Sequence, residues 1–270
     1  MLTRIVLSID LELFSDTFAF QKLNTVWASG ENGETGVIKL LELFRQHNIT
    51  TTFFVVARHA KSHKHLLQQV KENGHEIASH TLTHRSLLSL TNTEIRSEVQ
   101  DSKKILEDTI GCEVQGFRAP AFAINEYIVD TIIKGGYRYD SSVAPCIHIP
   151  GWYGFPNAPR FKFNIREIYP AISTDFTEFP VAVNPIMHIP VSGMWMRMLG
   201  KNYVIWSIQS LMKVDAIPVI CVHPWELVEL PRLNGIPWRV YHQTGRRTLK
   251  IIDHILKDIN AHFVPIRDLL

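Results

Sequence analysis

Short apolar runs alternate with stretches of helical periodicity along this chain, and this alternation limits the fold more than any other feature. The β-branched runs 4–9, 50–57 and 217–222 are typical of strands buried on both faces. Between the first two, residues 37–44 place apolar side chains at the spacing of an amphipathic helix. Strands that alternate with helices favour an α/β fold with a parallel sheet, either a (β/α) barrel or a doubly wound sheet.

Polar and charged residues follow the predicted strands directly. In both architectures the C-terminal ends of parallel strands gather at one mouth, where functional residues collect. We therefore expect the following residues on one rim around one metal: Asp10, Glu12, His80, His84, Arg118, Asp140 and His223. Taken alone, the two acids after the first strand would fit the solvated start of a loop.

His80 and His84 stand four residues apart, which is a common spacing of metal ligands. Two histidines leave the site incomplete, because a catalytic zinc takes three protein ligands and keeps one position open for water. A carboxylate must therefore come from elsewhere in the chain. Without such support, an H-x-x-x-H pattern more often marks a pair of partly exposed loop histidines.

A second histidine cluster, formed by His59, His63 and His65, is not predicted to bind metal. It lies among lysines, has no carboxylate close in sequence and opens a stretch of helical periodicity. A solvated helical face explains this cluster better.

Composition excludes several classes of function. Of the 270 residues, 46% are hydrophobic and 20% are charged, with a formal net charge of +2. These values are typical of a globular protein, and we expect a single domain over residues 1–270. The dispersed basic residues give no indication of nucleic acid binding.

The cysteines and the apolar runs bear on the compartment. Cys112, Cys146 and Cys221 lack a C-x-x-C pattern and are predicted to be buried thiols in a reducing compartment. No apolar run reaches the ~20 residues that a membrane span needs, and residues 1–9 lack the features of a signal peptide. We expect a soluble cytoplasmic protein.

The segment 145–170 is rich in proline, glycine and aromatic residues and shows no periodicity. Such a composition predicts a long ordered loop that covers one face of the domain. This loop could form a wall of a substrate site.

Five short motifs, in chain order, give the sequence a family resemblance. They are residues 8–12, 79–84, 118–120, 139–142 and 221–226. Together they resemble the polysaccharide deacetylase (NodB-homology) family, carbohydrate esterase family four, over nearly the whole chain. Context of this kind makes the metal interpretation of His80 and His84 far more specific. Residues 175–181 and 223–227 resemble the branch of the family found with exopolysaccharide and O-antigen biosynthesis.

The resemblance implies a distorted (β/α) barrel, expected to have seven strands, with a metal site at the C-terminal mouth. It also implies hydrolysis of an N-acetyl group on a sugar with the help of a divalent metal, Zn²⁺ first and Co²⁺, Ni²⁺ or Mn²⁺ as alternatives. We expect the substrate to be a nucleotide-linked or lipid-linked intermediate, or an oligosaccharide, of surface polysaccharide biosynthesis. The sequence does not indicate an oligomeric state.

The family pattern also implies roles for single residues. Glu12, His80 and His84 would bind the metal, Asp10 would be the general base and His223 the general acid. Arg118 would orient Asp10, and Asp140 would orient His223. Alternatively, Arg118 and Asp140 would form a structural ion pair.

Two departures from the family pattern matter. Many members carry adjacent aspartates in the first motif, whereas this chain has Asp10-Leu11-Glu12, so the roles of Asp10 and Glu12 could be exchanged. Arg85 stands where many members have proline.

Two other functions stay open. One is hydrolysis of a different amide bond, since relatives with this first-motif spacing include cyclic-amide and peptidoglycan hydrolases. The other is a metal-binding carbohydrate-recognition protein without turnover. The presence of both a candidate base and a candidate acid weighs against the second.

Overall fold

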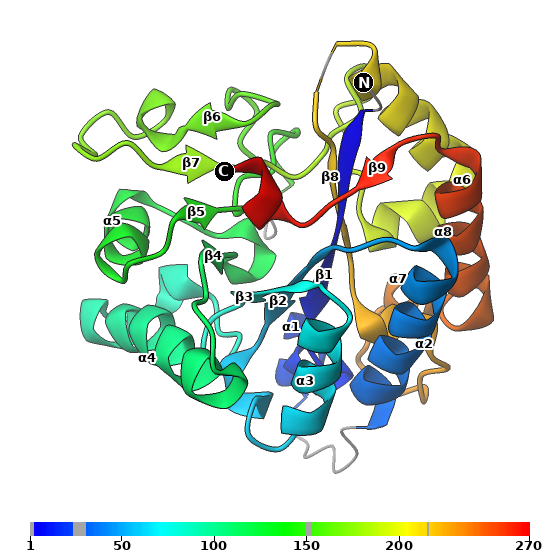
Figure 1. Ribbon diagram of the computed structural model, residues 1–270, viewed down its shortest axis with the longest axis horizontal. Coiled ribbons are helices and arrows are strands. Elements are labelled where there is room, and N and C mark those ends of the chain that lie inside the picture. Colours follow the sequence, from blue (N-terminus) through cyan, green and yellow to red (C-terminus); the bar gives the residue numbers. More distant parts are fainter. Residues whose placement is uncertain (1–2, 24–30, 150–152, 215) are drawn as a thin grey trace.

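The computed structural model describes residues 3–23, 31–149, 153–214 and 216–270 (Figure 1). Within this part of the chain, nine strands form one sheet in the order β6-β7-β5-β4-β3-β2-β1-β8, and β9 pairs with β1. The strands are β1 (Arg4–Leu11), β2 (Thr52–Val55), β3 (Glu76–Ser79), β4 (Gly116–Phe117), β5 (Tyr139–Asp140), β6 (Phe163–Asn164), β7 (Thr177–Glu178), β8 (Val219–Val222) and β9 (His262–Phe263).

The sheet curls into the predicted distorted barrel. The seven strands from β7 to β8 are joined by parallel pairings throughout. Val181, three residues after β7, bridges to Val219 in β8 and so links the two ends of this parallel path. The expected seven strands correspond to this path, but the count was too low, because β6 adds an antiparallel strand on β7 and β9 adds a parallel one on β1. Two-residue strands such as β6 leave too few positions for a periodic signal.

Helices cover the outside of the barrel (Figure 1). The longer ones are α2 (Glu31–His47), α3 (Lys64–Glu72), α4 (Asn92–Ile110), α5 (Glu126–Lys134), α6 (Gly193–Met212) and α8 (Arg246–Asp258), and the short ones are α1 (Phe18–Gln21) and α7 (Trp238–Tyr241). Each longer helix contacts the next around the barrel, in the order α5-α4-α3-α2-α8-α6. Their buried faces and the outer faces of the strands form the main hydrophobic core.

Strand β1 passes through the centre of the molecule and separates two cores (Figure 1). Its residues Ile5, Leu7 and Ile9 belong to the core beneath the helices, whereas Val6 belongs to a second core inside the barrel. Because side chains alternate along a strand, Asp10 continues the inward-facing row that begins at Val6. A carboxylate therefore lies at the C-terminal mouth of the barrel.

The N-terminal end of the barrel is closed by the 3-10 helix η7 (Ile266–Leu269) near the C-terminus of the chain. Ile266 and Leu269 pack into the inner core, and the Ile266 amide donates to Thr52 Oγ1 at 2.8 Å. Only the opposite end of the barrel is left for the predicted polar rim.

The segment 145–170 is only partly the irregular loop that we predicted. It contains β6 and the 3-10 helix η5 (Ile165–Glu167), and Phe163 and Ile165 are buried. Positions 150–152 of this segment lie outside the described residues.

The three cysteines are free, and Cys146 and Cys221 are buried as predicted. The prediction is wrong for Cys112, which is exposed just beyond the C-terminus of α4. None of the helices in the described residues is long and apolar enough to span a bilayer.

Candidate active site

Asp10 points into the barrel, where Arg118 binds one of its oxygens. The fully buried Arg118 guanidinium donates from Nη1 to Asp10 Oδ1 at 2.6 Å and to Ser8 Oγ at 2.8 Å. It also donates to the carbonyl and the Oγ of Ser141, and it lies 4.0 Å from the ring centroid of Phe54. Burial raises the pKa of the Asp10 carboxyl, but the charge of Arg118 and two nearby histidines hold this pKa well below its usual range. Arg118 therefore lies beside Asp10, as the sequence predicted.

His80 and His84 follow β3 and present the same ring nitrogen to one point. Each ring uses Nδ1 to donate to a backbone carbonyl, that of Arg118 at 2.7 Å for His80 and that of Asp16 at 2.8 Å for His84. These bonds leave the Nε2 lone pair of each neutral ring free. A histidine whose other nitrogen donates to a carbonyl is the usual arrangement of a metal ligand.

Glu12 supplies the carboxylate that the two histidines lacked. Its Oε1 accepts from Trp225 Nε1 at 2.9 Å, whereas Oε2 lies 2.5 Å from His84 Nε2 without hydrogen-bond geometry. Ligand atoms of Glu12, His80 and His84 all lie within 4.8 Å of one another, and each residue is less than 5% exposed. A cation between three buried ligand atoms that face each other would satisfy all of them, so this set fits a divalent metal.

The loop that carries both histidines has an uncommon backbone. Thr81 and His84 adopt φ angles of +66° and +61°, which non-glycine residues rarely do, and β-branched residues least of all. Glu98 of α4, itself buried, accepts from the amides of Leu82 and Thr83 at 2.9 and 2.8 Å. The strained loop is thus secured by a helix that lies outside the site.

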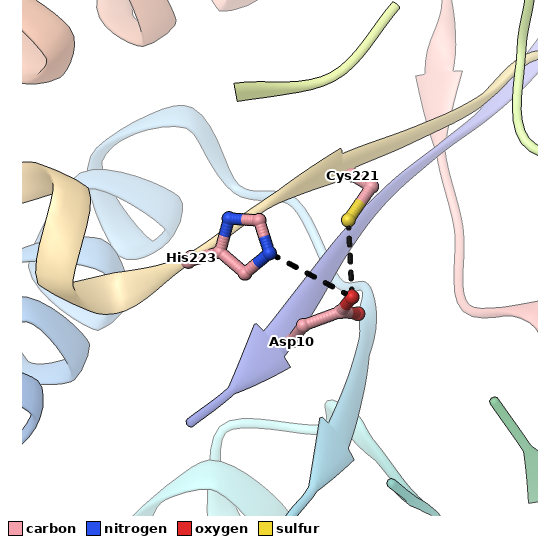
Figure 2. Close-up of side chains that lie close together, drawn as sticks. All are labelled: Asp10, Cys221 and His223. Carbon is pink, nitrogen blue, oxygen red and sulfur yellow. Dashed lines mark hydrogen bonds and ion pairs between the residues drawn. The ribbon is translucent and has the colours of Figure 1, made fainter. Parts of the chain in front are cut away.

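His223 follows β8, the strand paired directly with β1, and its ring faces Asp10 (Figure 2). Its Nε2 lies 4.0 Å from Asp10 Oδ2 and 3.8 Å from Glu12 Oε1, and its ring stacks on Trp225. Its Nδ1 binds Glu226 Oε2 at 3.1 Å. Burial lowers the pKa of His223, but the carboxylates of Glu226, Glu12 and Asp10 together outweigh burial and raise it to about 9.

The predicted partner of His223, Asp140, is therefore replaced by Glu226. The Asp140 carboxylate accepts instead from the Ser141 amide at 2.9 Å and from Ser142 Oγ at 2.5 Å. Burial raises the pKa of Asp140 and of the neighbouring Glu178. The alternative of an Arg118–Asp140 ion pair is not realised either, because Arg118 pairs with Asp10. At the end of a two-residue strand, sequence alone could not show which way the Asp140 carboxylate points.

Cys221 is a contact that the sequence interpretation missed. Its Sγ donates to Asp10 Oδ2 at 3.2 Å (Figure 2), and burial raises the pKa of this thiol, which keeps it protonated. Cys221 lies on β8 and stands two residues before His223, which directly follows this strand. Both side chains therefore point to the same side. That spacing was the available signal.

The second histidine cluster differs from the prediction at one position. His65 is largely exposed and pairs with Glu34, as expected for a solvated face. His59, in contrast, binds the buried carboxylate of Asp16 at 2.8 Å, and the carbonyl of Asp16 is the one that orients His84. The carboxylate lies far away in sequence, which is why the pairing was not predicted.

Comparison with known proteins agrees with this geometry. A family described as "Polysaccharide deacetylase" matches residues 25–139, and a domain of unknown function, DUF3473, matches residues 141–270. The peptidoglycan deacetylase of Helicobacter pylori is 20% identical over 249 residues, which are 81% of this chain and 85% of that protein. The chitooligosaccharide deacetylase of Azorhizobium caulinodans is 33% identical over 47% of this chain and 58% of its own length. Two further curated relatives are matched over only 19% and 46% of their lengths.

Solved structures show the same fold. A putative polysaccharide deacetylase from Mycobacterium smegmatis superposes with a TM-score of 0.65 at 18% identity, over 98% of this chain and 88% of that one. A carbohydrate esterase family four pseudoenzyme from Bacillus anthracis has a TM-score of 0.56 at 14% identity, over 99% of this chain and 65% of that one. With its ordered motifs, its curled parallel barrel and these matches, the chain carries a polysaccharide deacetylase domain in residues 25–139 and shares its fold with carbohydrate esterase family four structures.

Proposed function

We propose that this protein removes the N-acetyl group from an amino sugar, with a divalent metal held by Glu12, His80 and His84. The observation that carries the proposal is the convergence of three buried ligand atoms between two further groups, Asp10 and His223. Those two groups are our candidates for the general base and the general acid.

The ligand set favours Zn²⁺, since two imidazoles and one carboxylate form a familiar catalytic zinc site. Co²⁺, Ni²⁺ and Mn²⁺ remain the alternatives that the same donors would accept. When bound, the metal would polarise the acetyl carbonyl and lower the pKa of water.

Asp10 is the proposed general base. Arg118 binds its Oδ1, and its Oδ2, which also accepts from Cys221 Sγ, would take the proton from the attacking water. Glu12 is the proposed ligand, since its Oε2 faces the Nε2 of His84 directly. A carboxylate bound to a metal is a weak base, so the two acids need separate roles.

His223 is the proposed general acid. Its Nε2 approaches the site from β8, across from the loop that carries His80 and His84. From there it would donate a proton to the nitrogen of the leaving amine, which is a poor leaving group without that proton.

The proposed substrate is a nucleotide-linked or lipid-linked intermediate, or an oligosaccharide, of surface polysaccharide biosynthesis. Residues 175–181 and 223–227 support this choice through their resemblance to the exopolysaccharide-associated branch. The curated relatives are named for peptidoglycan and chitooligosaccharides, so fragments of both are the competing substrates. The proposal includes a cytoplasmic location, which three free cysteines support.

The test is acetate release from a panel of N-acetylated nucleotide sugars, chitooligosaccharides and peptidoglycan fragments, after the metal content has been measured. We expect acetate release that depends on bound metal, with the highest kcat/KM for a nucleotide-linked or lipid-linked sugar. Amide cleavage without acetate would instead indicate a different amide hydrolase. Saccharide binding without any turnover would indicate a pseudoenzyme.

A further inference from the structure

Glu226 is a fully buried carboxylate whose two oxygens have different partners. Its Oε2 accepts from the backbone amide of His223 at 2.9 Å and from the ring Nδ1 of the same residue at 3.1 Å. Its Oε1 accepts from Arg197 Nε at 2.8 Å. A charged carboxylate in the interior is costly unless it is paired, and here every contact is charge-assisted or directed at His223.

Arg197 is itself immobilised. It lies on α6, is 1% exposed, and its Nη1 donates to the carbonyls of Arg239, Val240 and His242. These bonds hold the guanidinium in one orientation, so Glu226 meets a fixed charge.

Gly193, at the start of α6, lets the helix approach Glu226 closely. A Cβ at this position would lie 1.9 Å from Glu226 Oε2, the oxygen that binds His223. Any larger residue at this position must therefore displace the carboxylate.

We infer that Glu226 is the positioning residue of His223, and that Arg197 holds Glu226 in place from helix α6. With Nδ1 occupied by Glu226, the ring turns its Nε2 toward Glu12 and toward Asp10, and the approach to Asp10 is drawn in Figure 2. Because the Glu226 carboxylate accepts the Nδ1 hydrogen, the proton that the protonated ring can transfer is the one on Nε2. This inference rests on the proposed function, since it concerns the proton that His223 delivers.

The proton balance is simple. The carbonyl carbon gains a bond to the oxygen of water, and Asp10 takes a proton from that water. When the C–N bond breaks, its electron pair stays on the nitrogen, which takes the proton from His223 Nε2. Glu226 remains ionised throughout and continues to accept the hydrogen bond from Nδ1–H of His223, so it acts only through His223.

A purely structural role for Glu226 predicts different kinetics. Its acceptance of the His223 amide also caps the 3-10 helix η6 (Pro224–Leu227). If capping were its whole contribution, loss of Glu226 would lower every activity of the enzyme together. A positioning role instead affects only reactions that need a proton on the leaving group.

The test compares Glu226→Gln with the native enzyme on an N-acetylated sugar and on 4-nitrophenyl acetate, whose leaving group departs without a proton. For the sugar we expect kcat to fall about 10²-fold with little change in KM, the lower end of what general acid catalysis supplies. For 4-nitrophenyl acetate we expect a change within about twofold, with metal content unchanged.

Two more variants keep the inference testable if Glu226→Gln does not fold. Glu226→Asp retains a carboxylate and should recover part of the sugar activity, and Arg197→Lys should show a weaker form of the same selective loss. Glu76→Gln, which alters a buried glutamate at the other end of the barrel, is the matched control and should show no selective loss.

Equal losses on both substrates, loss of metal, or full activity of Glu226→Gln on the sugar would overturn the inference. Failure of the native enzyme on every N-acetylated sugar would instead overturn the proposed function. The two failures are therefore distinguishable.

Discussion

Two buried glutamates at opposite ends of the barrel show how a structural carboxylate differs from a functional one. Glu76 and Glu12 are each 3% exposed, so burial does not separate them. The oxygens of Glu76 accept from Thr52 Oγ1 at 2.7 Å, from the Tyr139 hydroxyl at 3.0 Å and from the Arg267 amide at 3.0 Å. Burial raises the pKa of Glu76 despite these bonds. Protein donors therefore satisfy both oxygens of Glu76 without any bound ligand.

Glu12 is surrounded in the opposite way. One oxygen accepts from Trp225, but the other faces the free nitrogen of His84, with His80 close by. Acceptors that meet acceptors in a buried site are satisfied only by a cation or by added protons. The comparison teaches that the type of partner, and not the degree of burial, marks the metal site.

The largest expected effect comes from removing a histidine ring at the C-terminal mouth of the barrel. His80→Ala or His84→Ala deletes one of three ligands, so we expect loss of stoichiometric metal and of detectable deacetylation. Metal content by mass spectrometry and acetate release measure both effects. The exposed His65→Ala is the control and should keep both properties. Stoichiometric metal in both His80→Ala and His84→Ala would show that these residues do not form the metal site.

The next comparison separates the two acids of the first motif. Asp10→Asn should bind metal normally but lose about 10²–10⁴-fold in kcat, because it removes the base. Glu12→Gln should bind metal weakly, since an amide oxygen is a poorer ligand, and added metal should partly restore its activity. Metal titration of both variants decides the outcome. If Asp10→Asn loses metal and Glu12→Gln keeps it, the two roles must be exchanged.

His223→Ala tests the acid side of the mouth. We expect metal binding to be retained and kcat on an N-acetylated sugar to fall about 10²–10⁴-fold, because the proton donor is gone. Steady-state kinetics on the metal-loaded protein measure the loss. An unchanged kcat would exclude His223 from the reaction.

A smaller effect is expected from Glu98→Gln. The change weakens the bonds that secure the strained loop between Thr81 and His84 without altering a ligand. Outer contacts of this kind typically contribute at least tenfold to metal affinity, so we expect a Kd about tenfold weaker. Competition with a chromogenic chelator measures the Kd. An unchanged Kd would show that the loop keeps its shape without Glu98.

The smallest functional effect should come from a change at the N-terminal end of the barrel. Glu76→Gln places an amide among hydrogen-bond donors, so we expect the free energy of unfolding to fall by about 1–3 kcal/mol. Metal content and kcat should not change. Chemical denaturation and acetate release provide the two measurements. A loss of metal in Glu76→Gln would contradict the conclusion that Glu76 is structural and that only the C-terminal mouth binds metal.

The parallel barrel and the convergence of Glu12, His80 and His84 could be predicted because their signals are local. A buried strand needs a continuous apolar run, and the residues after it must leave at the C-terminal edge of the sheet. His80 and His84 follow one such strand, β3, and Asp10 and Glu12 lie at the end of another, β1. Because both strands pair with β2 in parallel, their C-terminal ends lie at the same edge of the sheet without further information from the sequence.

The acid half could not be predicted in the same way. The family pattern suggested Asp140 as the partner of His223, whereas the structure places Glu226 on its Nδ1. That choice depends on Arg197 and Gly193 of α6, which pack against η6 from a distant part of the chain.

The sequence by itself therefore determined the alternation of strands and helices, the end of the barrel at which polar residues collect and the candidate metal ligands found there. Tertiary structure alone decided the pairing of buried charges, including Arg118 with Asp10, His59 with Asp16 and Arg197 with Glu226. The physical reason is that a strand or a cap depends on neighbouring residues, whereas the energy of a buried ion pair depends on distance and desolvation, which packing sets.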